Sequence, residues 1–533
     1  MRNRPARSSA LEVTLGCLSQ AAAMCRAVDP WPGWGPGAAP VLISLEQQGS
    51  LLLGVPEPPP GFGRLAQADG LAVLYRPGLV ETQRLANGVL AGRHQVAAWS
   101  GRVIPAVNFS PARDAVTSMG LLVRELFRAT AALDLAGSVA ATAGTGEEDE
   151  LSEVSAMPAG TEDFADDALR RKAALLRQLQ AAYERYPETQ VLNNVLGNLE
   201  GRLLYGHLSD SGFGEEAGEV TGQSQPAATA RALALVRRER HAGMGPSTIG
   251  YERRMELFEG LPRFVELALL RAMCGADGIP LTPGFKAVVG DGYHETATRL
   301  VAARFGMLTQ LNVRGWGASR RRFYYSGAAI AFLLDDVVPG WRREVVLEGR
   351  PLDLVLEAVA DFDGGTVDEK LLETTRRYYG YYERLEDEQQ WSRDTADRRR
   401  ELLAGVFSGP GTKVTLDVSA LNAKSAWYDT ATAERIGESV IVHVRPGVFT
   451  YGDGGTFVEC RGLAMVEDRR AKLFHVTVPG TNLAIVGDEE PVGAARGAEF
   501  TEGLNVELGG LRIRARRGVL VREGDSLYIR VLA

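Results

Sequence analysis

Hydrophobic and polar positions change their spacing twice along the 533-residue chain. Up to about residue 110, one partly apolar helical stretch precedes short strand-like runs such as residues 41–45, and Gly and Pro separate these runs. From residue 115, apolar residues recur at helical spacing, and helical patterns continue to about residue 405. After residue 409 the runs are short and β-branched, and residues 511–516 alternate with period two.

These patterns predict a multidomain α+β protein. We expect an N-terminal α+β module at residues 1–110, a central and mostly helical domain at 111–405, and a C-terminal all-β sandwich at 406–533. Residues 139–166 predict an acidic surface linker within the central domain, because they are rich in Ala, Gly, Thr, Glu and Asp.

Helical spacing also gives expected bounds for the central elements. Residues 209–225 are polar and Gly-rich, which predicts a connector. Gly380 is a candidate break in the last helix. The expected helices are residues 115–135, 168–186, 191–208, 227–242, 252–274, 295–305, 326–337, 352–360 and 369–403.

Composition narrows the class of protein. The formal net charge is -8, and an acidic surface disfavours nonspecific binding to nucleic acid. Residues 11–28 predict a mature helix rather than a targeting segment, because Glu12 interrupts the apolar run. We find no apolar run long enough to span a membrane, and the four cysteines form no C-x-x-C pair. We therefore expect a cytoplasmic protein with neither nucleic acid nor membrane as partner.

One stretch of the helix expected from residue 115 carries candidate chemistry. It reads Arg124-Glu125-Leu126-Phe127-Arg128. The corresponding helix of zincins reads H-E-x-x-H, in which two His on one helical face chelate zinc and the Glu polarises the attacking water. Glu125 keeps the place of that Glu, whereas arginines stand at both histidine positions.

Two later segments extend this likeness. Residues 255–266 are similar to the gluzincin helix that supplies the third zinc ligand, with Glu259 at the ligand position and Phe258 in place of the usual Asn. Residues 322–329 resemble an aromatic-Gly-Ala segment of bacterial proteins in this group. Over residues 115–360 the chain therefore resembles gluzincin-type bacterial metallopeptidase-like proteins with a degenerate zinc site. The resemblance implies a zincin-like central domain.

Arginine cannot take over the role of the lost histidines. A guanidinium group has five donors and no acceptor, and it stays protonated at physiological pH. Arg124 and Arg128 therefore cannot ligate zinc, and we expect neither a metal nor a cofactor. If the fold is retained, two guanidinium groups face the carboxylates of Glu125 and Glu259.

Two interpretations of this arrangement stay open. The arginines pair with Glu125, Glu256 or Glu259 and lock two helices together. Alternatively, Arg124, Arg128 and Glu259 bind the carboxylate or phosphate of a substrate, and Glu125 or Glu259 serves as general base.

Other polar residues give weaker signals. Tyr325 either donates its phenolic hydroxyl to an oxyanion as a catalytic group or packs in the core. Glu200 either faces the same cleft or forms a salt bridge. His207 and His241 lie near expected helix ends, and we expect both to face solvent.

Two functions follow. The first is a non-hydrolytic pseudoenzyme, in which the former cleft or the β domain binds a small anionic or peptide-like ligand or a protein partner. The second is a repurposed, metal-independent enzyme that uses the cleft for acid–base chemistry on an anionic or peptide-like small substrate. An active zinc peptidase would need a histidine pair, which we do not find in the sequence.

Overall fold

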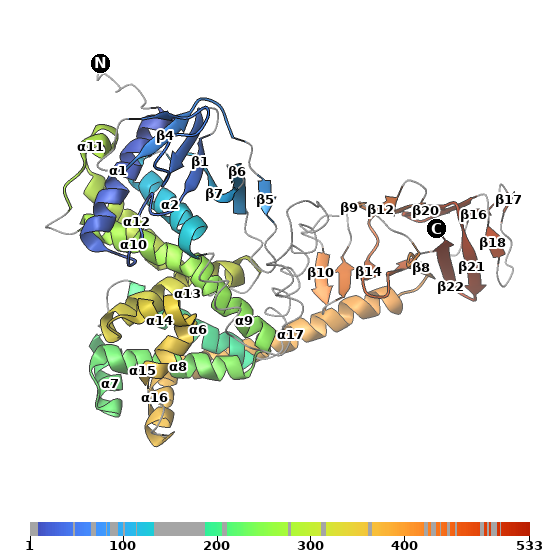
Figure 1. The fold of residues 1–533 in the computed structure, drawn as a ribbon. Coiled ribbons are helices and arrows are strands. Elements are labelled where there is room, and N and C mark those ends of the chain that lie inside the picture. The colour runs from blue at the N-terminus through green and yellow to red at the C-terminus, as the bar shows by residue number, and fades with distance from the viewer. Residues whose placement is uncertain are drawn as a thin grey trace, which may run out of the picture. The chain divides into compact units, whose positions relative to one another are not determined.

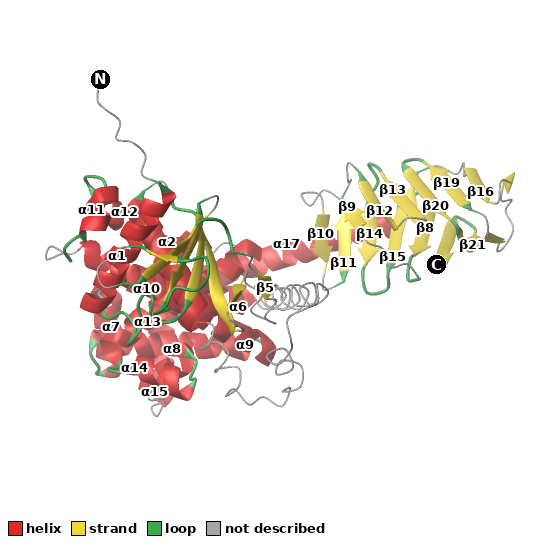
Figure 2. Ribbon diagram, turned by 45° about the horizontal axis from the view of Figure 1, so that its top comes forward, coloured by secondary structure: helices red, strands yellow, loops and turns green. Residues whose placement is uncertain are grey.

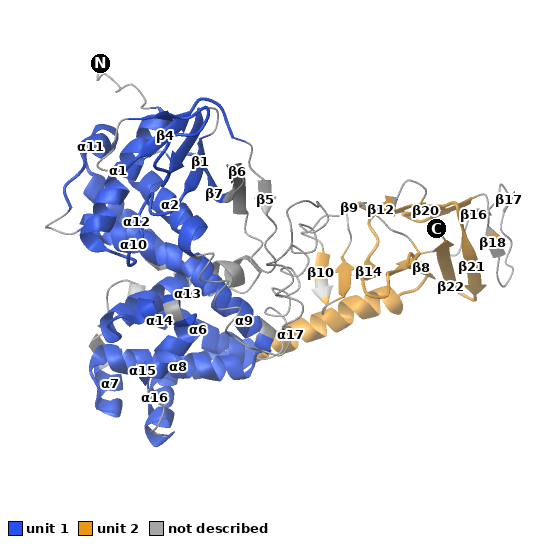
Figure 3. Ribbon diagram, in the orientation of Figure 1, with its two compact units in different colours: residues 1–388 blue, residues 389–533 orange. Residues whose placement is uncertain are grey.

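The structure is a computed structural model with a mixed α/β fold, in which helices dominate the middle of the chain and the C-terminal strands form sheets (Figures 1 and 2). Its contacts divide the chain into unit 1, Met1–Glu388, and unit 2, Gln389–Ala533 (Figure 3). The structure describes residues 9–45, 48–65, 71–80, 83–85, 94–99, 102–112, 114–132, 187–204, 211–274, 279–310, 316–360, 365–420, 425–427, 433–436, 439–444, 448–453, 456–479, 484–487, 490–491, 498–500 and 503–532.

Unit 1 begins with a helix followed by a mixed sheet. The strand order is β3-β4-β2-β1-β7-β6-β5. β1 and β7 pair in parallel, with Leu42 opposite Ala106, and the other pairs are antiparallel among the residues that the structure describes. The strands are β1 (Val41–Leu45), β2 (Gly49–Leu53), β3 (Gly63–Arg64), β4 (Val73–Arg76), β5 (Gln83–Leu85), β6 (His94–Trp99) and β7 (Arg102–Phe109).

The first helix, α1 (Ala10–Val28), has defined ends. Ser9 Oγ accepts from the backbone N–H of Glu12 at 3.2 Å, and a Glu12 carboxylate oxygen accepts from the backbone N–H of Ser9 at 2.7 Å, which is a capping box. At the other end Asp29 adopts the left-handed conformation, with φ of 44°, and terminates the helix.

One hydrophobic core extends through unit 1 and crosses the expected boundary at residue 110. Residues of α1 such as Leu18 and of β1 such as Ile43 belong to the same buried cluster as Leu122 and Leu270 from later helices. The opposite face of the sheet carries a smaller hydrophobic cluster, which contains Leu42 of β1 and residues of β2, β4 and β7. The sheet and the helices therefore form one compact unit, and the expected three-part division stays a prediction.

Helices make up the rest of unit 1 that the structure describes. Among these residues, two π-helical segments, η1 and η2, follow directly on regular helices. The segments are α2 (Ala115–Phe127), η1 (Arg128–Ala132), α6 (Pro187–Leu204), α7 (Ser211–Thr221), α8 (Gln225–Ala242), α9 (Pro246–Met255), η2 (Glu256–Gly260), α10 (Leu261–Cys274), α11 (Pro283–Val288), α12 (Tyr293–Gln310), α13 (Trp316–Val337), α14 (Trp341–Glu348), α15 (Leu352–Ala360), α16 (Gly365–Tyr378) and α17 (Tyr381–Phe407).

Several helix predictions need correction. Residues 209–225 are not simply a connector, because α7 forms there, with Ala217 buried where α7 contacts α8 and α16. Tertiary packing outweighs the low helix propensity of the glycines. The helix expected at 252–274 is divided into α9, η2 and α10. The expected helix at 168–186 and the acidic linker at 139–166 lie outside the described residues.

The candidate break at Gly380 separates α16 from α17. Gly380 adopts the left-handed conformation with φ of 63°, which glycine accepts without steric cost. α17 then continues through the expected boundary at residue 405 and ends at Phe407. From Gln389 on, α17 belongs to unit 2, and Val406 in its last turn packs with Val442 and Val466.

Unit 2 consists of two sheets besides this helix. The first has the strand order β10-β11-β14-β15-β8-β22-β21-β18, and the second has the order β17-β16-β19-β20-β13-β12-β9. The strands are β8 (Thr412–Asp417), β9 (Ser425–Trp427), β10 (Ala433–Ile436), β11 (Val440–His443), β12 (Phe449–Asp453), β13 (Thr456–Cys460), β14 (Met465–Asp468), β15 (Leu473–Val478), β16 (Ala484–Gly487), β17 (Glu490–Pro491), β18 (Ala498–Phe500), β19 (Leu504–Leu508), β20 (Leu511–Ala515), β21 (Arg517–Glu523) and β22 (Ser526–Leu532).

Both sheets contribute to one hydrophobic core in unit 2. Phe474 and Ile529 come from the first sheet, and Val458 and Ile513 come from the second. Strand β20 alternates buried and exposed side chains, as its period-two sequence predicts. Among the described residues, none of the helices is long and apolar enough to cross a membrane.

Candidate functional site

The candidate site begins on α2, whose sequence separates an apolar face from a charged one. Asp114 caps the helix, since its side chain accepts from the backbone N–H of Thr117 at 2.7 Å. Met119, Leu122 and Leu126 are buried at helical spacing. The charged side chains at positions 124, 125 and 128 follow a different face and are partly exposed.

Four charged side chains meet there, and we call them the arginine–glutamate cluster: Arg124, Glu125, Arg128 and Glu259. Arg124 Nε and Nη2 donate to Glu125 Oε1 at 3.1 and 2.7 Å. Arg128 Nη2 donates to Glu125 Oε2, and Arg128 Nη1 donates to Glu259 Oε2 at 3.4 Å. Arg128, the first residue of η1, therefore connects η1 with η2, which carries Glu259.

The cluster lies between the two π-helical segments. Arg128 is the first residue of η1, Glu259 lies in η2, and the two segments contact each other. A π-turn inserts an extra residue and changes the direction of the side chains that follow, and such turns often occur at functional sites. The irregular backbone on both sides thus brings an arginine and a glutamate 131 positions apart into contact.

Further charges lie behind the cluster. Arg263 Nη1 donates to Glu266 Oε2, and both side chains are buried. Arg304 Nε lies 3.9 Å from Glu266 Oε1. Burial lowers the pKa of Arg124, but the carboxylates of Glu266 and Glu125 outweigh burial and raise it. Arg124 is therefore a permanent cation of the site.

Tyr325 lies in the core, with 4% of its surface exposed. The guanidinium carbon of Arg263 lies 5.3 Å from the centre of its ring, which is a cation–π contact. Arg263 is close enough to Arg124 for that charge to lower its pKa, although burial is the larger cause. Tyr325 thus contacts the second layer of charges, and the contacts that the structure describes do not join its hydroxyl to Glu125.

The donor set of this cluster suits anions rather than metal ions. Both oxygens of Glu125 accept N–H groups of guanidinium, and Arg124 and Arg128 have no lone pair for a metal. Among the described residues, we find no group of three His, Cys, Asp or Glu side chains placed to hold a metal ion. The residues present do not fit a zinc centre.

A second set of charged side chains is fully buried nearby, and only Glu200 and Glu256 among them were singled out from the sequence. We call it the buried cluster: Arg237, Arg240, Glu200, Glu252, Glu256, Arg322 and Asp353. Arg237 donates to both oxygens of Glu256 at 2.9 and 2.8 Å, and Ser326 Oγ donates to Glu256 Oε1 at 2.7 Å. Glu256 therefore pairs with Arg237 rather than with Arg124 or Arg128.

The buried cluster decides between the alternatives for Glu200 and corrects the prediction for His241. Glu200 forms a buried salt bridge with Arg322 at 2.8 Å, instead of facing the arginine–glutamate cluster. His241 does not face solvent, because it is 9% exposed and its Nε2 lies 3.6 Å from Glu252. His207 lies outside the described residues. Glu252 and Glu256 stand four apart, on one face of a helical stretch, and this spacing was the available signal.

We find no protein-family model, no curated protein and no solved structure that matches this chain. The resemblance to gluzincin-type proteins therefore stays a prediction from short segments of sequence. A functional assignment has to rest on the geometry of the arginine–glutamate cluster and on the chemistry that guanidinium and carboxylate groups allow.

Proposed function

We propose that this chain is a metallopeptidase-like protein in which the arginine–glutamate cluster replaces the zinc centre. We further propose that it acts as a non-hydrolytic binding or scaffold protein. The observation that carries the proposal is the position of Arg128, whose guanidinium contacts both Glu125 and Glu259. In the family that the sequence resembles, position 128 supplies a metal ligand and position 259 another. Here the side chains at the same two positions, Arg128 and Glu259, form an ion pair with each other.

In this proposal, the hydrogen bonds account for the loss of hydrolysis. A zinc hydrolase needs a metal that polarises water and a carboxylate free to take its proton. Both oxygens of Glu125 are engaged by guanidinium donors. Arg124 and Arg128 repel a divalent cation, so the site offers neither requirement.

Binding is compatible with the exposure of the same residues. The side chains of Arg124, Glu125 and Arg128 keep 23%, 19% and 23% of their surface exposed. A carboxylate or phosphate of a small or peptide-like ligand can exchange with Glu125 on these two guanidinium forks. A protein partner with an acidic side chain would use the same contacts.

Unit 2 is the second part of the proposal. Its two sheets share one core, and buried residues alternate with exposed residues along β13, β20 and β22. These features support a β-sandwich, which is a common binding module. In this proposal the sandwich presents the partner-binding surface of a protein without hydrolytic activity.

Restoring the histidines tests the proposal. In the double variant Arg124→His and Arg128→His, the sequence H-E-x-x-H and Glu259 together provide three metal ligands. We expect this variant to retain about one zinc per chain after loading and desalting, measured by elemental analysis, because a zincin-like geometry places these ligands together. Adding Glu259→Gln should weaken zinc binding by at least about tenfold.

The matched control is the double variant Arg124→Ala and Arg128→Ala, which removes the same charges without supplying ligands. It should bind no zinc above background. The proposal is wrong if the folded histidine variant binds no more zinc than this control. It is also wrong if the unaltered protein, purified without added metal, carries stoichiometric zinc.

The second candidate function is a metal-independent enzyme, and one observation favours it. Solvent reaches the arginine–glutamate cluster, whereas the side chains of Arg237 and Glu256 are 1% exposed. Cells that carry the Arg124→Ala and Arg128→Ala chain would then accumulate a substrate and lose a product, while the melting temperature of the protein stays within a few degrees. An unchanged metabolite profile favours the binding function instead.

A further inference from the structure

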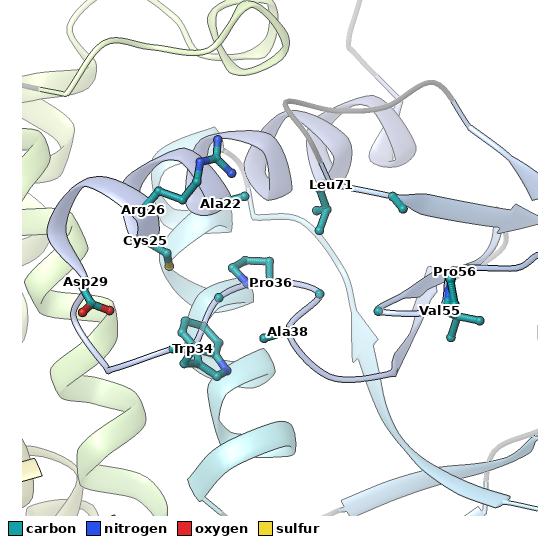
Figure 4. A pocket seen from close by; sticks show the side chains of 15 residues that line it. Ala22, Cys25, Arg26, Asp29, Trp34, Pro36, Ala38, Val55, Pro56 and Leu71 are labelled. Carbon is teal, nitrogen blue, oxygen red and sulfur yellow. The ribbon is translucent and has the colours of Figure 1, made fainter. Parts of the chain in front are cut away.

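A pocket of about 750 Å³ opens between the C-terminal end of α1 and the loop that leads to the sheet. Figure 4 shows the side chains around it, including Cys25, Asp29, Trp34, Pro36 and Leu71. Its volume lies in the range of small-molecule sites. The residues that line it are all described, and none of them belongs to the arginine–glutamate cluster.

Apolar side chains form most of the walls. Trp34, Pro36, Val55 and Leu71 line the pocket from the loop and from the sheet. Gly37 keeps this space open, because a Cβ atom there would lie 2.5 Å from Leu71 Cδ1 and its φ of +87° is costly for other residues. Such walls suit a ligand with an apolar or aromatic body.

Part of the loop backbone around the pocket has no free N–H to offer a ligand. Pro32 and Pro36 have no N–H. The N–H of Trp34 donates to the carbonyl of Trp31 at 3.0 Å, and the N–H of Ala38 donates to the carbonyl of Gly35 at 3.0 Å. These two loop donors are thus engaged. The carbonyl of Cys25 in the last turn of α1 accepts from the N–H of Asp29 at 2.9 Å, whereas the three carbonyl groups after it lie beyond the last helical donor.

The charged side chains at the pocket also bear on the kind of ligand it binds. Asp29 stands at the C-terminal end of α1, where the helix dipole is already negative and a carboxylate is unfavourable. Among the described residues, neither Asp29 nor Arg26 takes part in an ion pair. Arg26 partly compensates the negative end of the helix, and both Arg26 and Asp29 are exposed to solvent. A carboxylate and an aromatic ring that line the same pocket both attract a cation.

Cys25 has no nucleophilic role in this pocket. Burial is the main cause that raises the pKa of its thiol to about 12, and the neighbouring Asp29 raises it further. The thiol therefore stays protonated at neutral pH and behaves as an apolar wall. The pocket is suited to reversible binding.

We propose that this pocket binds an organic cation, namely a protonated amine carried by an apolar or aromatic body. The ammonium group donates to the Asp29 carboxylate and to carbonyl oxygens at the end of α1. The apolar body packs on Trp34, Pro36 and Leu71. This inference goes beyond the proposed function, and it does not depend on whether the arginine–glutamate cluster replaces a zinc centre.

The pocket is connected to the helix that carries the arginine–glutamate cluster. Trp34 Nε1 donates to Thr130 Oγ1 in η1 at 3.0 Å, and the ring of Trp34 meets the ring of Phe127 edge to face at 5.0 Å. Arg128 lies between these two residues in the sequence. A bound cation therefore contacts the aromatic side chain that supports the start of η1.

The test uses the full chain and three probes of similar shape: benzylammonium, benzyl alcohol and benzoate. The protein carries seven tryptophans. Labelling them with fluorotryptophan gives a fluorine NMR signal for Trp34, which the Trp34→Phe variant assigns. We expect benzylammonium to shift this signal with a Kd on the order of 1 mM. Benzyl alcohol should bind about fivefold more weakly, and benzoate should leave the signal unchanged.

Three variants locate the charge that matters. Asp29→Asn should weaken benzylammonium binding about fivefold, and Arg26→Gln should strengthen it about twofold. Glu57→Gln, which removes an exposed carboxylate outside the pocket, should leave it unchanged. The proposal is overturned if benzoate binds as tightly as benzylammonium, if none of the probes shifts the Trp34 signal at about 20 mM, or if Asp29→Asn has no effect.

Discussion

Arg128 joins the two halves of the arginine–glutamate cluster because of the shape of its side chain. A guanidinium group presents donors in a planar fork, so one arginine can contact Glu125 and Glu259 at the same time. A lysine at this position offers a single point charge on a flexible stem and would favour one carboxylate. The residue type therefore determines whether the two helices are linked at this point.

Glu256 is a carboxyl group of the buried cluster with a raised pKa. Burial, helped by the nearby carboxylates of Glu252 and Asp353, raises its pKa to about 7, although Arg237 opposes the shift. One guanidinium serves several carboxylates, because Arg237 also lies 3.4 Å from Glu252 and 3.7 Å from Glu200. The carboxylates of Glu256, Glu252 and Asp353 in turn raise the pKa of Arg237 well above its usual range, against the effect of burial.

This shift predicts a pH dependence of stability. A carboxyl with a raised folded-state pKa holds a proton that the unfolded chain has lost, so its contribution is full below the unfolded value of 4.5 and is lost as the pH rises through about 7. Glu256→Gln cannot titrate. Relative to this variant, the unaltered protein should lose about 2 to 4 kcal/mol of unfolding free energy between pH 5 and pH 8, measured by urea denaturation.

Glu57→Gln provides the comparison for this experiment, since Glu57 is an exposed carboxylate of the same unit. Its stability difference from the unaltered protein should stay within about 0.5 kcal/mol at every pH. A difference for Glu256→Gln that does not change between pH 5 and pH 8 would show that Glu256 is ionised with an ordinary pKa.

At the scale of elements, η2 and α13 meet through their backbones. A Cβ atom on Gly327 would lie 2.5 Å from the carbonyl oxygen of Glu256, and one on Gly260 would lie 2.7 Å from the Cα atom of Gly327. The absence of side chains at both positions allows this close approach. It holds the π-turn in the position from which Glu259 reaches Arg128.

Gly327→Ala should therefore destabilise the protein by about 2 kcal/mol, although alanine is the better helix former, because backbone atoms cannot move aside as a flexible side chain can. Thermal unfolding followed by circular dichroism measures this change. Gly250→Ala in α9 is the matched control: its Cβ atom would meet Arg254 Nη1 at 3.5 Å, which is an ordinary contact. It should stabilise by up to about 1 kcal/mol. Equal effects of the two substitutions would contradict this account.

At the scale of the whole molecule, the two units have separate cores. Leu270 belongs to the large cluster of unit 1, and Ile513 belongs to the cluster that the two sheets of unit 2 share. Both side chains have no exposed surface. Because cooperative unfolding follows a shared core, we expect each unit to unfold as its own cooperative unit.

Calorimetry should therefore resolve two transitions. Ile513→Ala should lower the midpoint temperature of one transition, because the cavity costs about 3 kcal/mol of unfolding free energy. The midpoint of the other transition should stay within about one degree. Leu270→Ala should lower the other transition by a similar free energy. A single transition that both substitutions move together would indicate that the two units unfold as one.

Local patterns predicted much of the secondary structure. The apolar spacing of α2 and α15, the period-two alternation of β20 and the break at Gly380 depend on neighbours in sequence, and the structure has each of them. The pairing of arginine with glutamate was one of the two interpretations that the residue types allowed. A guanidinium group has no lone pair for a metal and has donors that fit a carboxylate.

Only the tertiary structure decided where the other charges go. Glu256 pairs with Arg237 and His241 is buried, because helices distant in sequence close around them. The two π-turns arise where η1 and η2 contact each other, and α7 forms because Ala217 is buried against neighbouring helices. Contacts between distant segments carry these features, and the spacing of residues along one helix contains no information about its partner.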